Sequence, residues 1–342
     1  MTTLWIMLLL VVFLAGTAAA GMKYRNETTN FWSPDYTQTL KGLFCIVVAL
    51  VHTPPAYQNP VQDLIGSFAY IGVTFFFMSS AYGLKYGYDH KKNYLEHFWR
   101  NRLGSIFIPM LLANILFCFV NALYSSPDAF NVRSILHINA WVKMLLLFYA
   151  LFYLVYKVFA HEKYSLVRDI VLCVLVVAVS IAGRCVSHRI AGVWPTECLG
   201  FLYGILLARF LNPVKKMLSQ AKNRHTIAFL FFTVLLGVLY LKFKYINVWG
   251  DYLLKIILGI AILCTLFLVT GKFQIGNKVS LFLGTISYEI YLIHEKVYAL
   301  LDRMVTGMDS GMFIMLSLAL TVGISAGVFY ISKPLIAKIR KT

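Results

Sequence analysis

One short apolar segment has a cation at its start and an imidazole at its end. It reads Lys41-Gly-Leu-Phe-Cys-Ile-Val-Val-Ala-Leu-Val-His52 and is followed by Thr53, Pro54 and Pro55. In a helix, Lys41 and His52 would lie on nearly one face, ~16 Å apart along the axis at about 1.5 Å per residue. Pro54 disfavours helical geometry at the residue before it, so the helix is expected to end at about His52. This pattern predicts a proton acceptor at one lip of a membrane helix and a positive charge at the other, which suits chemistry across a bilayer.

Few ionisable residues interrupt the apolar segments of the chain. Each is costly, because a charged side chain at the centre of a membrane helix costs ~2.5–3.5 kcal/mol on insertion scales. Glu197 lies early in one apolar segment, and Glu289 and His294 lie in a later one. We expect His52, Glu197 and His294 to meet at a similar depth in the outer half of the membrane, as a catalytic group. The alternative is structural: His294 would be a hydrogen-bonding residue, and Glu197 a protonated carboxyl bonded to backbone.

A polar stripe is expected in the helix that contains His294. Ser287, Tyr291, His294 and Tyr298 are spaced i, i+4, i+7 and i+11, which puts them on one helical face. Ser287 and Tyr291 are therefore predicted to line a substrate pocket with His294. Glu289 is rotated away from this face and is expected to bond to a neighbouring helix.

The segment from Lys85 to Pro109 is rich in basic and aromatic residues, and it is expected to form a loop before a membrane helix. Arginine side chains grip phosphates with two parallel hydrogen bonds, and aromatic rings can stack on a base. Arg100 and Arg102 are therefore candidates for binding an anion that bears a nucleotide. The alternative is an interfacial segment whose arginines anchor helix ends and whose rings form an aromatic belt.

These residues must be positioned by membrane helices, because the composition excludes an ordinary soluble protein. The 342 residues are 60% hydrophobic and 13% charged, whereas soluble domains are ~25% charged. Apolar segments long enough to span a bilayer recur along the chain. They cover about 4–20, 40–53, 65–84, 103–123, 137–156, 166–183, 192–208, 226–241, 251–270, 279–301 and 311–332. The predicted fold is an all-α polytopic bundle of about eleven helices, with a first helix and linker at 1–37 and one membrane domain at 38–342.

A net charge of +17 is typical of proteins that bind nucleic acid, but the distribution of the basic residues along this chain instead indicates how the protein is oriented in a membrane. Most of them fall on one side if the loop before Lys41 is cytoplasmic, which predicts a cytoplasmic C-terminus and contact with anionic lipid. Residues 1–20 resemble a signal peptide, yet no basic residues precede their apolar core. We expect a retained helix with an extracytoplasmic N-terminus, because cleavage would leave Lys23 and Arg25 outside.

The six cysteines and eight histidines do not follow a zinc-site spacing, so no metal site is predicted. Four cysteines lie in apolar segments, where a thiol behaves as a small hydrophobe. Cys185 and Cys198 flank an outer loop and could form a disulfide.

Four motifs, in their order along the chain, resemble those of the acyltransferase-3 family of integral-membrane acyltransferases. The resemblance covers about residues 38–340. Lys41 and His52 match the basic residue and the essential histidine of the family's first helix. Phe75-Phe-Phe-Met-Ser-Ser-Ala-Tyr-Gly83 matches its Phe-rich run, with Ala81 where glycine is usual. Phe98-Trp-Arg-Asn-Arg-Leu-Gly-Ser-Ile-Phe-Ile-Pro109 keeps the outline of the third motif, although its arginines are closer together than in the family and Ser105 replaces a residue that is often basic. Ser287-Tyr-Glu-Ile-Tyr-Leu-Ile-His294 is similar to the family's late signature.

The resemblance implies a ten-helix acyltransferase core preceded by one extra helix, in a bacterial inner membrane. It implies acetyl-CoA, or another short acyl-CoA, as a co-substrate used from the cytoplasm, with no permanently bound cofactor. The acceptor would be a hydroxyl of a cell-envelope glycan or glycolipid. Lys41, Arg100 and Arg102 would hold the CoA phosphates, and His52 would act as general base or acyl carrier. Glu197 would assist an imidazole, while Ser287, Tyr291 and His294 would stabilise the oxyanion or shape the cavity.

Two alternatives stay open at this stage. A proton-coupled transporter or flippase of glycans or lipids would use the same buried histidine and glutamate as a proton relay. The sequence lacks the duplicated halves that many transporters have. The other alternative is an enzyme that acylates a small metabolite or lipid from a pocket that opens inward. The acceptor, the acyl chain length and the oligomeric state are not predicted.

Overall fold

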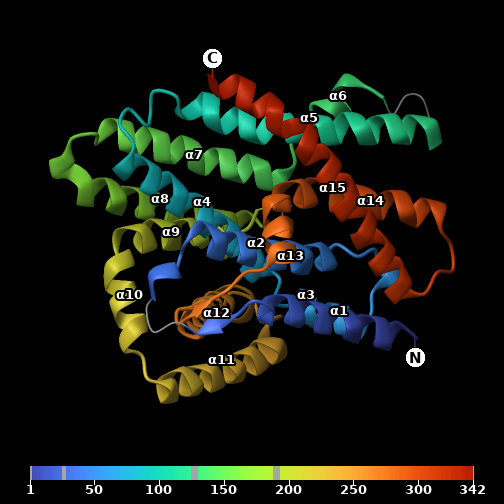
Figure 1. The fold of residues 1–342 in the computed structure, drawn as a ribbon, viewed down its shortest axis with the longest axis horizontal. Helices are drawn as coiled ribbons and strands as arrows, with labels where there is room; N and C mark the ends of the chain where they lie inside the picture. Colours follow the sequence, from blue (N-terminus) through green and yellow to red (C-terminus); the bar gives the residue numbers. More distant parts are fainter. Residues whose placement is uncertain (1, 25–27, 125–129, 188–192, 342) are drawn as a thin grey trace.

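Helices form almost all of the regular structure in the computed structural model, which describes residues 2–24, 28–124, 130–187 and 193–341 (Figure 1). The α-helices are α1 (Thr2–Ala19), α2 (Pro34–Val51), α3 (Pro60–Gly66), α4 (Tyr70–His90), α5 (Phe98–Tyr124), α6 (Val132–Ile135), α7 (Ala140–Val158), α8 (Ser165–Val186), α9 (Leu199–Arg209), α10 (Leu211–Gln220), α11 (Asn223–Phe243), α12 (Lys255–Thr270), α13 (Lys278–Thr285), α14 (Ser287–Met304) and α15 (Ser310–Lys341). The predicted all-α fold is confirmed.

The remaining elements are short. They are the 3-10 turns η1 (Thr28–Asn30), η2 (Pro55–Tyr57) and η4 (Glu162–Tyr164), the π-helical turn η5 (Trp249–Leu254), and the strands β1 (Lys23–Tyr24) and β2 (Phe273–Gln274). The two strands pair antiparallel, with Lys23 opposite Gln274. The Asn277 side chain donates hydrogen bonds to the carbonyls of Thr17 and Ala20, at 2.6 and 3.0 Å. These contacts tie the end of α1 to the segment before α13.

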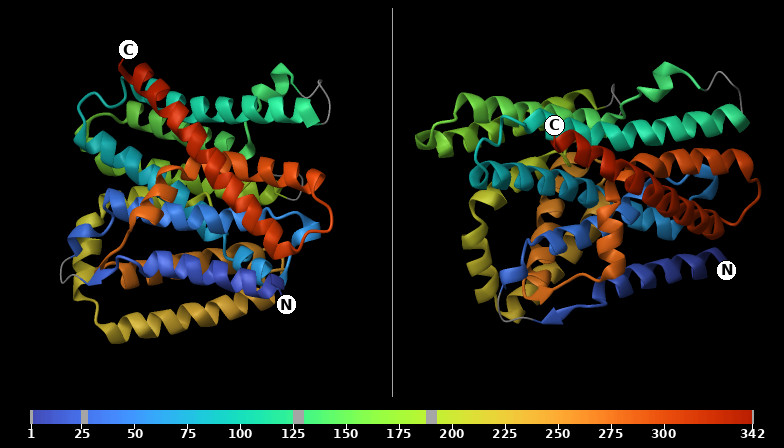
Figure 2. Two further views of the ribbon diagram at one scale, coloured as in Figure 1. Left: turned by 45° about the vertical axis from the view of Figure 1, so that its right-hand side comes forward. Right: turned by 45° about the horizontal axis from the view of Figure 1, so that its top comes forward.

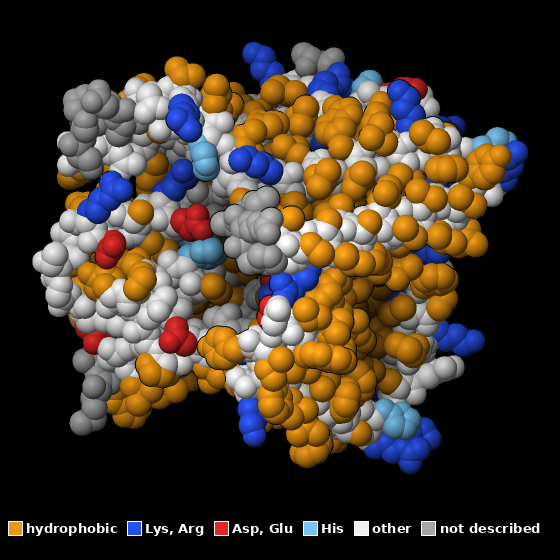
Figure 3. All heavy atoms as spheres, turned by 180° about the vertical axis from the view of Figure 1, so that it is seen from behind, with side chains coloured by type: hydrophobic (Ala, Val, Ile, Leu, Met, Phe, Trp, Pro, Cys, Tyr) orange, Lys and Arg blue, Asp and Glu red, His pale blue; other side chains and the backbone are white. Residues whose placement is uncertain are grey.

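Seven helical segments are long and apolar enough to cross a membrane within the described part of the chain. They contain α4, α5, α7, α8, α11, α12 and α15, while α1 and α9 are shorter apolar helices. Apolar side chains cover much of the face seen in Figure 3, and most of α11 is exposed on the outside of the bundle. A soluble protein would not leave such a large apolar surface in water. The chain is a multi-pass membrane protein.

Two boundaries differ from the expectation. The span expected at 279–301 is divided at Ile286, whose ψ of 12° lies outside helical values, into α13 and α14. The loop expected from Lys85 to Pro109 is reduced to residues 91–97, because α4 continues to His90 and α5 begins at Phe98. Residue 192, the first of the span expected at 192–208, lies outside the described residues. The two cysteines considered for a disulfide, Cys185 and Cys198, are both free.

Close backbone contact between α4 and α9 lies near the centre of the bundle. A Cβ atom added at Gly200 of α9 would lie 2.0 Å from the carbonyl oxygen of Thr74 in α4. Because this neighbour is backbone, it cannot rotate away. Views of the ribbon from two further directions show α10 leading from this layer to the α11–α12 pair at one side (Figure 2).

We expect Gly200→Ala to destabilise the protein by about 1–3 kcal/mol or more, since overpacking forces backbone shifts. The readout is the midpoint of thermal unfolding in detergent. The matched control is Gly83→Ala on α4, where an added Cβ would meet nothing within 4 Å. Equal midpoints for the two variants would contradict the close packing of α4 and α9.

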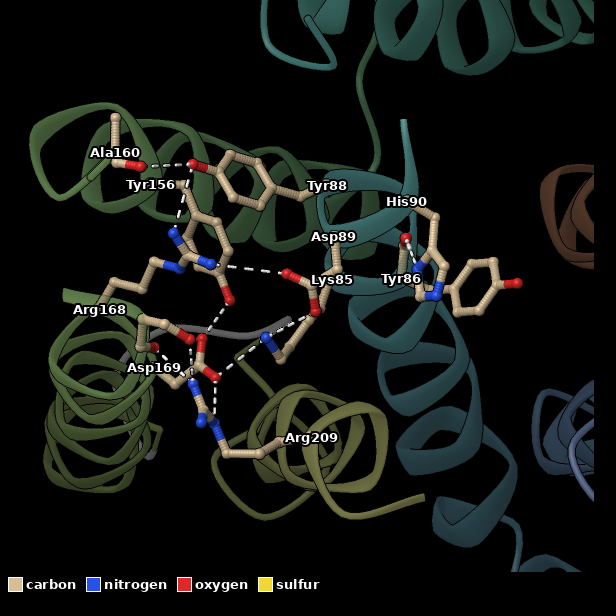
Figure 4. Close-up of polar contacts among 11 residues, drawn as sticks. Lys85, Tyr86, Tyr88, Asp89, His90, Tyr156, Ala160, Arg168, Asp169 and Arg209 are labelled. Carbon is tan, nitrogen blue, oxygen red and sulfur yellow. Dashed lines mark hydrogen bonds and ion pairs between the residues drawn. The ribbon is translucent and has the colours of Figure 1, made fainter. Parts of the chain in front are cut away.

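An ionic network joins α4, α8 and α9 (Figure 4). It consists of Lys85, Asp89, Arg168, Asp169 and Arg209. The Lys85 ammonium lies 2.9 Å from Asp89 and 3.1 Å from Asp169, and Arg209 Nε donates to Asp169 at 2.6 Å. Arg168 lies 3.6 Å from Asp89. Every charged group in the network has an oppositely charged partner, and these pairs hold three helices together.

Candidate active site

His52 lies at the end of α2 as the sequence predicts. Ser33 caps the start of this helix, and the His52 backbone N–H bonds to the carbonyls of Ala49 and Leu50 at its end. The Nδ1 atom of His52 lies 3.0 Å from Oε1 of Glu295, and both side chains are partly exposed. A hydrogen bond from Nδ1–H to the carboxylate leaves Nε2 of His52 as the nitrogen with a free lone pair.

His294 faces His52 across the contact between α2 and α14. Its ring centre lies 5.0 Å from that of His52, and the side chain is 1% exposed. Nδ1 of His294 lies 3.0 Å from the carbonyl oxygen of Ile290, which can only accept, so Nδ1 carries the proton. Nε2 is buried and has no hydrogen-bond partner among the described residues. The two imidazoles are therefore next to each other, and His294 offers an unused acceptor.

One ligand atom each from His52, His294 and Glu295 lies within 4.8 Å of the others. Three such groups could share a proton or hold a metal ion. The sequence predicts no metal site, and these residues follow no metal-binding spacing along the chain. Their proximity comes from the packing of α2 against α14.

A cavity of about 230 Å³ lies beside α2, where Lys41 and Val48, one turn before His52, contribute to its lining. Its polar lining includes Lys41, Ser79, Ser80, Ser105, Tyr149, Ser287 and Tyr291. The Tyr291 ring centre lies 5.8 Å from that of His294, and the Tyr298 ring centre lies 6.4 Å from it. The predicted stripe on α14 is thus one face, and it leads from this central cavity to the histidine pair.

Lys41 brings a positive charge into the central cavity. No carboxylate pairs with its ammonium group among the described residues. Arg102 lies close enough for the two positive charges to repel each other. An unpaired cation in a largely apolar cavity favours an anionic ligand there.

A second, basic pocket of about 300 Å³ adjoins the central cavity. It is lined by Lys91, Tyr94, Phe98, Asn101, Arg102 and Arg340. Arg340 donates to the Ser105 hydroxyl at 2.8 Å, and Ser105 also lines the central cavity. The Arg102 guanidinium lies 5.7 Å from the ring centre of Tyr149, another residue of that cavity. These contacts make the basic pocket and the central cavity neighbours, and Tyr291 links the central cavity to His294. We call this series, from the basic pocket through the central cavity to the histidine pair, the route.

Two of the predicted site residues lie off this route. Arg100 lines neither pocket, and its Nε is buried without a partner among the described residues. Glu197 forms an ion pair with Lys255 at 2.6 Å and accepts a hydrogen bond from Thr196 at 2.8 Å. Because its carboxylate is already bonded on both oxygens, its contacts do not support the expected role beside an imidazole.

The carboxylate beside His52 is Glu295, which sequence reasoning missed. Glu295 directly follows His294, and its side chain is 58% exposed, so it resembles an ordinary charge near a helix end. The one available signal was its position two turns after Ser287 on the polar side of α14. Buried Glu289, by contrast, lacks any side-chain bond to a neighbouring helix among the described contacts.

The comparisons with known proteins agree with this geometry. A family model described as an acyltransferase domain matches residues 35–332, most of the chain. No curated protein and no solved structure matches the chain. The match covers Lys41 and His52 of α2 and the polar stripe of α14, and it ends within α15, before Arg340. The chain therefore belongs to the acyltransferase-3 family.

Proposed function

We propose that this membrane acyltransferase moves a short acyl group, most simply acetyl, from acyl-CoA to a hydroxyl of a cell-envelope glycan. The observation that carries the proposal is the placement of the basic pocket, the central cavity and the histidine pair next to one another. The glycan acceptor follows from the family resemblance. The asymmetric distribution of basic residues supports a cytoplasmic position for the basic pocket and an outer position for His52.

Acyl-CoA would fit this route with its phosphates at the basic pocket and its thioester toward the histidines. Its phosphates would bind at the basic pocket, where Arg102 offers a planar guanidinium. Its flexible arm would pass Ser105 and Tyr149 into the central cavity, and the thioester would reach Tyr291 and the histidines. The hydroxyls of Ser287 and Tyr291 already donate to Gly284 O at 2.8 Å and Asn139 Oδ1 at 3.2 Å. They therefore shape the cavity instead of donating to an oxyanion.

The transfer step follows from the hydrogen bonds of His52. Glu295 accepts Nδ1–H and orients the ring, so Nε2 takes the proton of the acceptor hydroxyl while its oxygen attacks the thioester carbon. The carbon–sulfur bond then breaks, and the proton passes from Nε2 to the departing CoA thiolate. In the acyl-histidine alternative, the same lone pair of Nε2 attacks the thioester carbon first, and the carbon–sulfur bond breaks to release the CoA thiolate. The acceptor oxygen then attacks the acyl carbon, the carbon–nitrogen bond breaks, and the hydroxyl proton passes to the freed Nε2.

Proteoliposomes separate this function from proton-coupled transport. We would supply acetyl-CoA and crude envelope glycan, and measure CoA release and acetylated glycan with and without an uncoupler. Acyl transfer predicts both products, with turnover that persists after the proton gradient collapses. Glycan movement that depends on the gradient, without CoA release, would overturn the proposal in favour of the transporter.

Lys41→Met is expected to raise the KM for acetyl-CoA by about 10-fold or more, because a charge-assisted hydrogen bond to the donor is worth about 1.5–3 kcal/mol. Steady-state kinetics in detergent provide the measurement. Lys278→Met removes an exposed cation at the start of α13 and serves as the control. An unchanged KM in Lys41→Met would exclude Lys41 from donor binding.

Metal removal is expected to leave the activity unchanged, because Nδ1 of His52 already has a partner in Oε1 of Glu295, 3.0 Å away. The test is acetyl transfer after dialysis against a strong chelator, with metal content measured in the same sample. Loss of activity that added Zn²⁺ restores would contradict the proton-transfer role of this trio and indicate a metal centre.

A further inference from the structure

The basic pocket contains three cationic residues from segments that are far apart in the sequence. Lys91 follows α4, Arg102 lies in α5, and Arg340 lies near the end of α15. Arg340 is beyond residues 35–332, which match the acyltransferase domain. The C-terminal helix thus brings a charged group to a pocket that the matched domain does not complete by itself.

No described carboxylate lines this pocket or pairs with its three cations. Arg102 donates to the Tyr94 hydroxyl, and Arg340 donates to the Ser105 hydroxyl. Both partners are neutral. The ionic network at Lys85 is different, because there each cation has a carboxylate partner.

This difference points to a ligand. Three like charges around one space of about 300 Å³ repel one another, and a bound anion would offset that repulsion. Arginine side chains bind phosphate with parallel hydrogen bonds, while lysine adds a point charge. Asn101 lines the same pocket and offers an amide. The arrangement therefore suits a ligand with more than one phosphate.

We propose that Lys91 and Arg340, together with Arg102, bind the phosphate groups at the nucleotide end of the acyl-CoA donor. The inference rests on the proposed function and extends it, since it makes the C-terminal helix part of the donor site. Ser105 lines the cavity that would receive the acyl end and accepts a hydrogen bond from Arg340, which places this pocket next to that cavity.

Two donors test the assignment: acetyl-CoA, and acetylpantetheine, a thioester without phosphates. We expect Arg340→Ala and Lys91→Ala each to raise the KM for acetyl-CoA by about tenfold, with kcat unchanged. Neither variant should change the kinetics with acetylpantetheine. The matched control is Lys338→Ala, an exposed cation on the same helix that does not line the pocket. Equal effects on the two donors would indicate a structural role and overturn the proposal.

A binding experiment separates this inference from the proposed function. Adenosine 3′,5′-bisphosphate should bind the purified wild type, and Arg340→Ala should weaken that binding by about tenfold. Unchanged binding in the variant would overturn the inference even if wild-type turnover is intact.

The experiment is repeated in nanodiscs with and without phosphatidylglycerol. A variant effect that appears only with the anionic lipid would assign the pocket to a lipid headgroup and overturn the proposal. Bisphosphate binding that depends on Arg340, in a protein that never releases CoA, would support the pocket and reject the acyltransfer proposal.

Discussion

His52→Ala is expected to lower the kcat of acetyl transfer by about 1000-fold or more. A positioned general base contributes about 10²–10⁴-fold, and both routes considered for this site use the Nε2 lone pair of His52. Donor binding should persist, because the basic pocket and the central cavity lie elsewhere on the route. The measurement is CoA release at saturating acetyl-CoA, with acetyl-CoA binding recorded in the same preparation.

The matched control is His225→Ala, an exposed histidine in the first turn of α11. It should retain wild-type turnover. If His52→Ala binds the donor and turns over at the wild-type rate, the histidine pair is not the reaction centre.

Glu295→Gln gives the second large effect, a drop of about 100-fold in kcat. The amide keeps the size of the side chain but loses the negative charge that orients the His52 ring and stabilises its protonated form. Because Glu295 acts through His52 and does not touch the donor, the KM for acetyl-CoA should change little. The measurement is the separate determination of kcat and KM for this variant.

Asp302→Asn removes an exposed carboxylate two turns further along α14 and serves as the control. A higher KM with unchanged kcat in Glu295→Gln would contradict a positioning role. Such a result would mean that Glu295 contributes to binding and that His52 works without a carboxylate partner.

Local patterns in the sequence were sufficient for much of this architecture. Pro54 correctly predicted that α2 ends at about His52, because proline restricts the backbone of the residue before it, and this effect is local. The spacing of Tyr291 and His294 also gave the right helical face, since the period of 3.6 residues per turn needs no tertiary information. The break at Ile286 was missed because it depends on packing. A Cβ atom at Gly284 would lie 2.0 Å from the Gln38 carbonyl of α2, and no local signal reports that approach.

The partners across helices were the unpredictable part of the site. Glu197 looked like the carboxylate behind an imidazole because it is rare in its apolar setting, yet it pairs with Lys255. Lys255 lies near the edge of an apolar segment, and its position in the sequence does not identify it as a partner of Glu197. Glu295 and Arg340 reach the route only through the packing of α14 against α2 and of α15 against α5. Such pairings depend on how side chains interlock between distant helices, which one sequence does not determine.

The most direct test of the account follows a labelled acetyl group through the wild-type protein. Purified protein in liposomes would receive acetyl-CoA labelled in the acetyl group, with and without crude envelope glycan, and free CoA and label in the glycan would be measured together. We expect CoA release that depends on glycan and that equals, mole for mole, the label gained by the glycan. Folded protein that neither binds acetyl-CoA nor releases CoA in the presence of glycan would contradict the account.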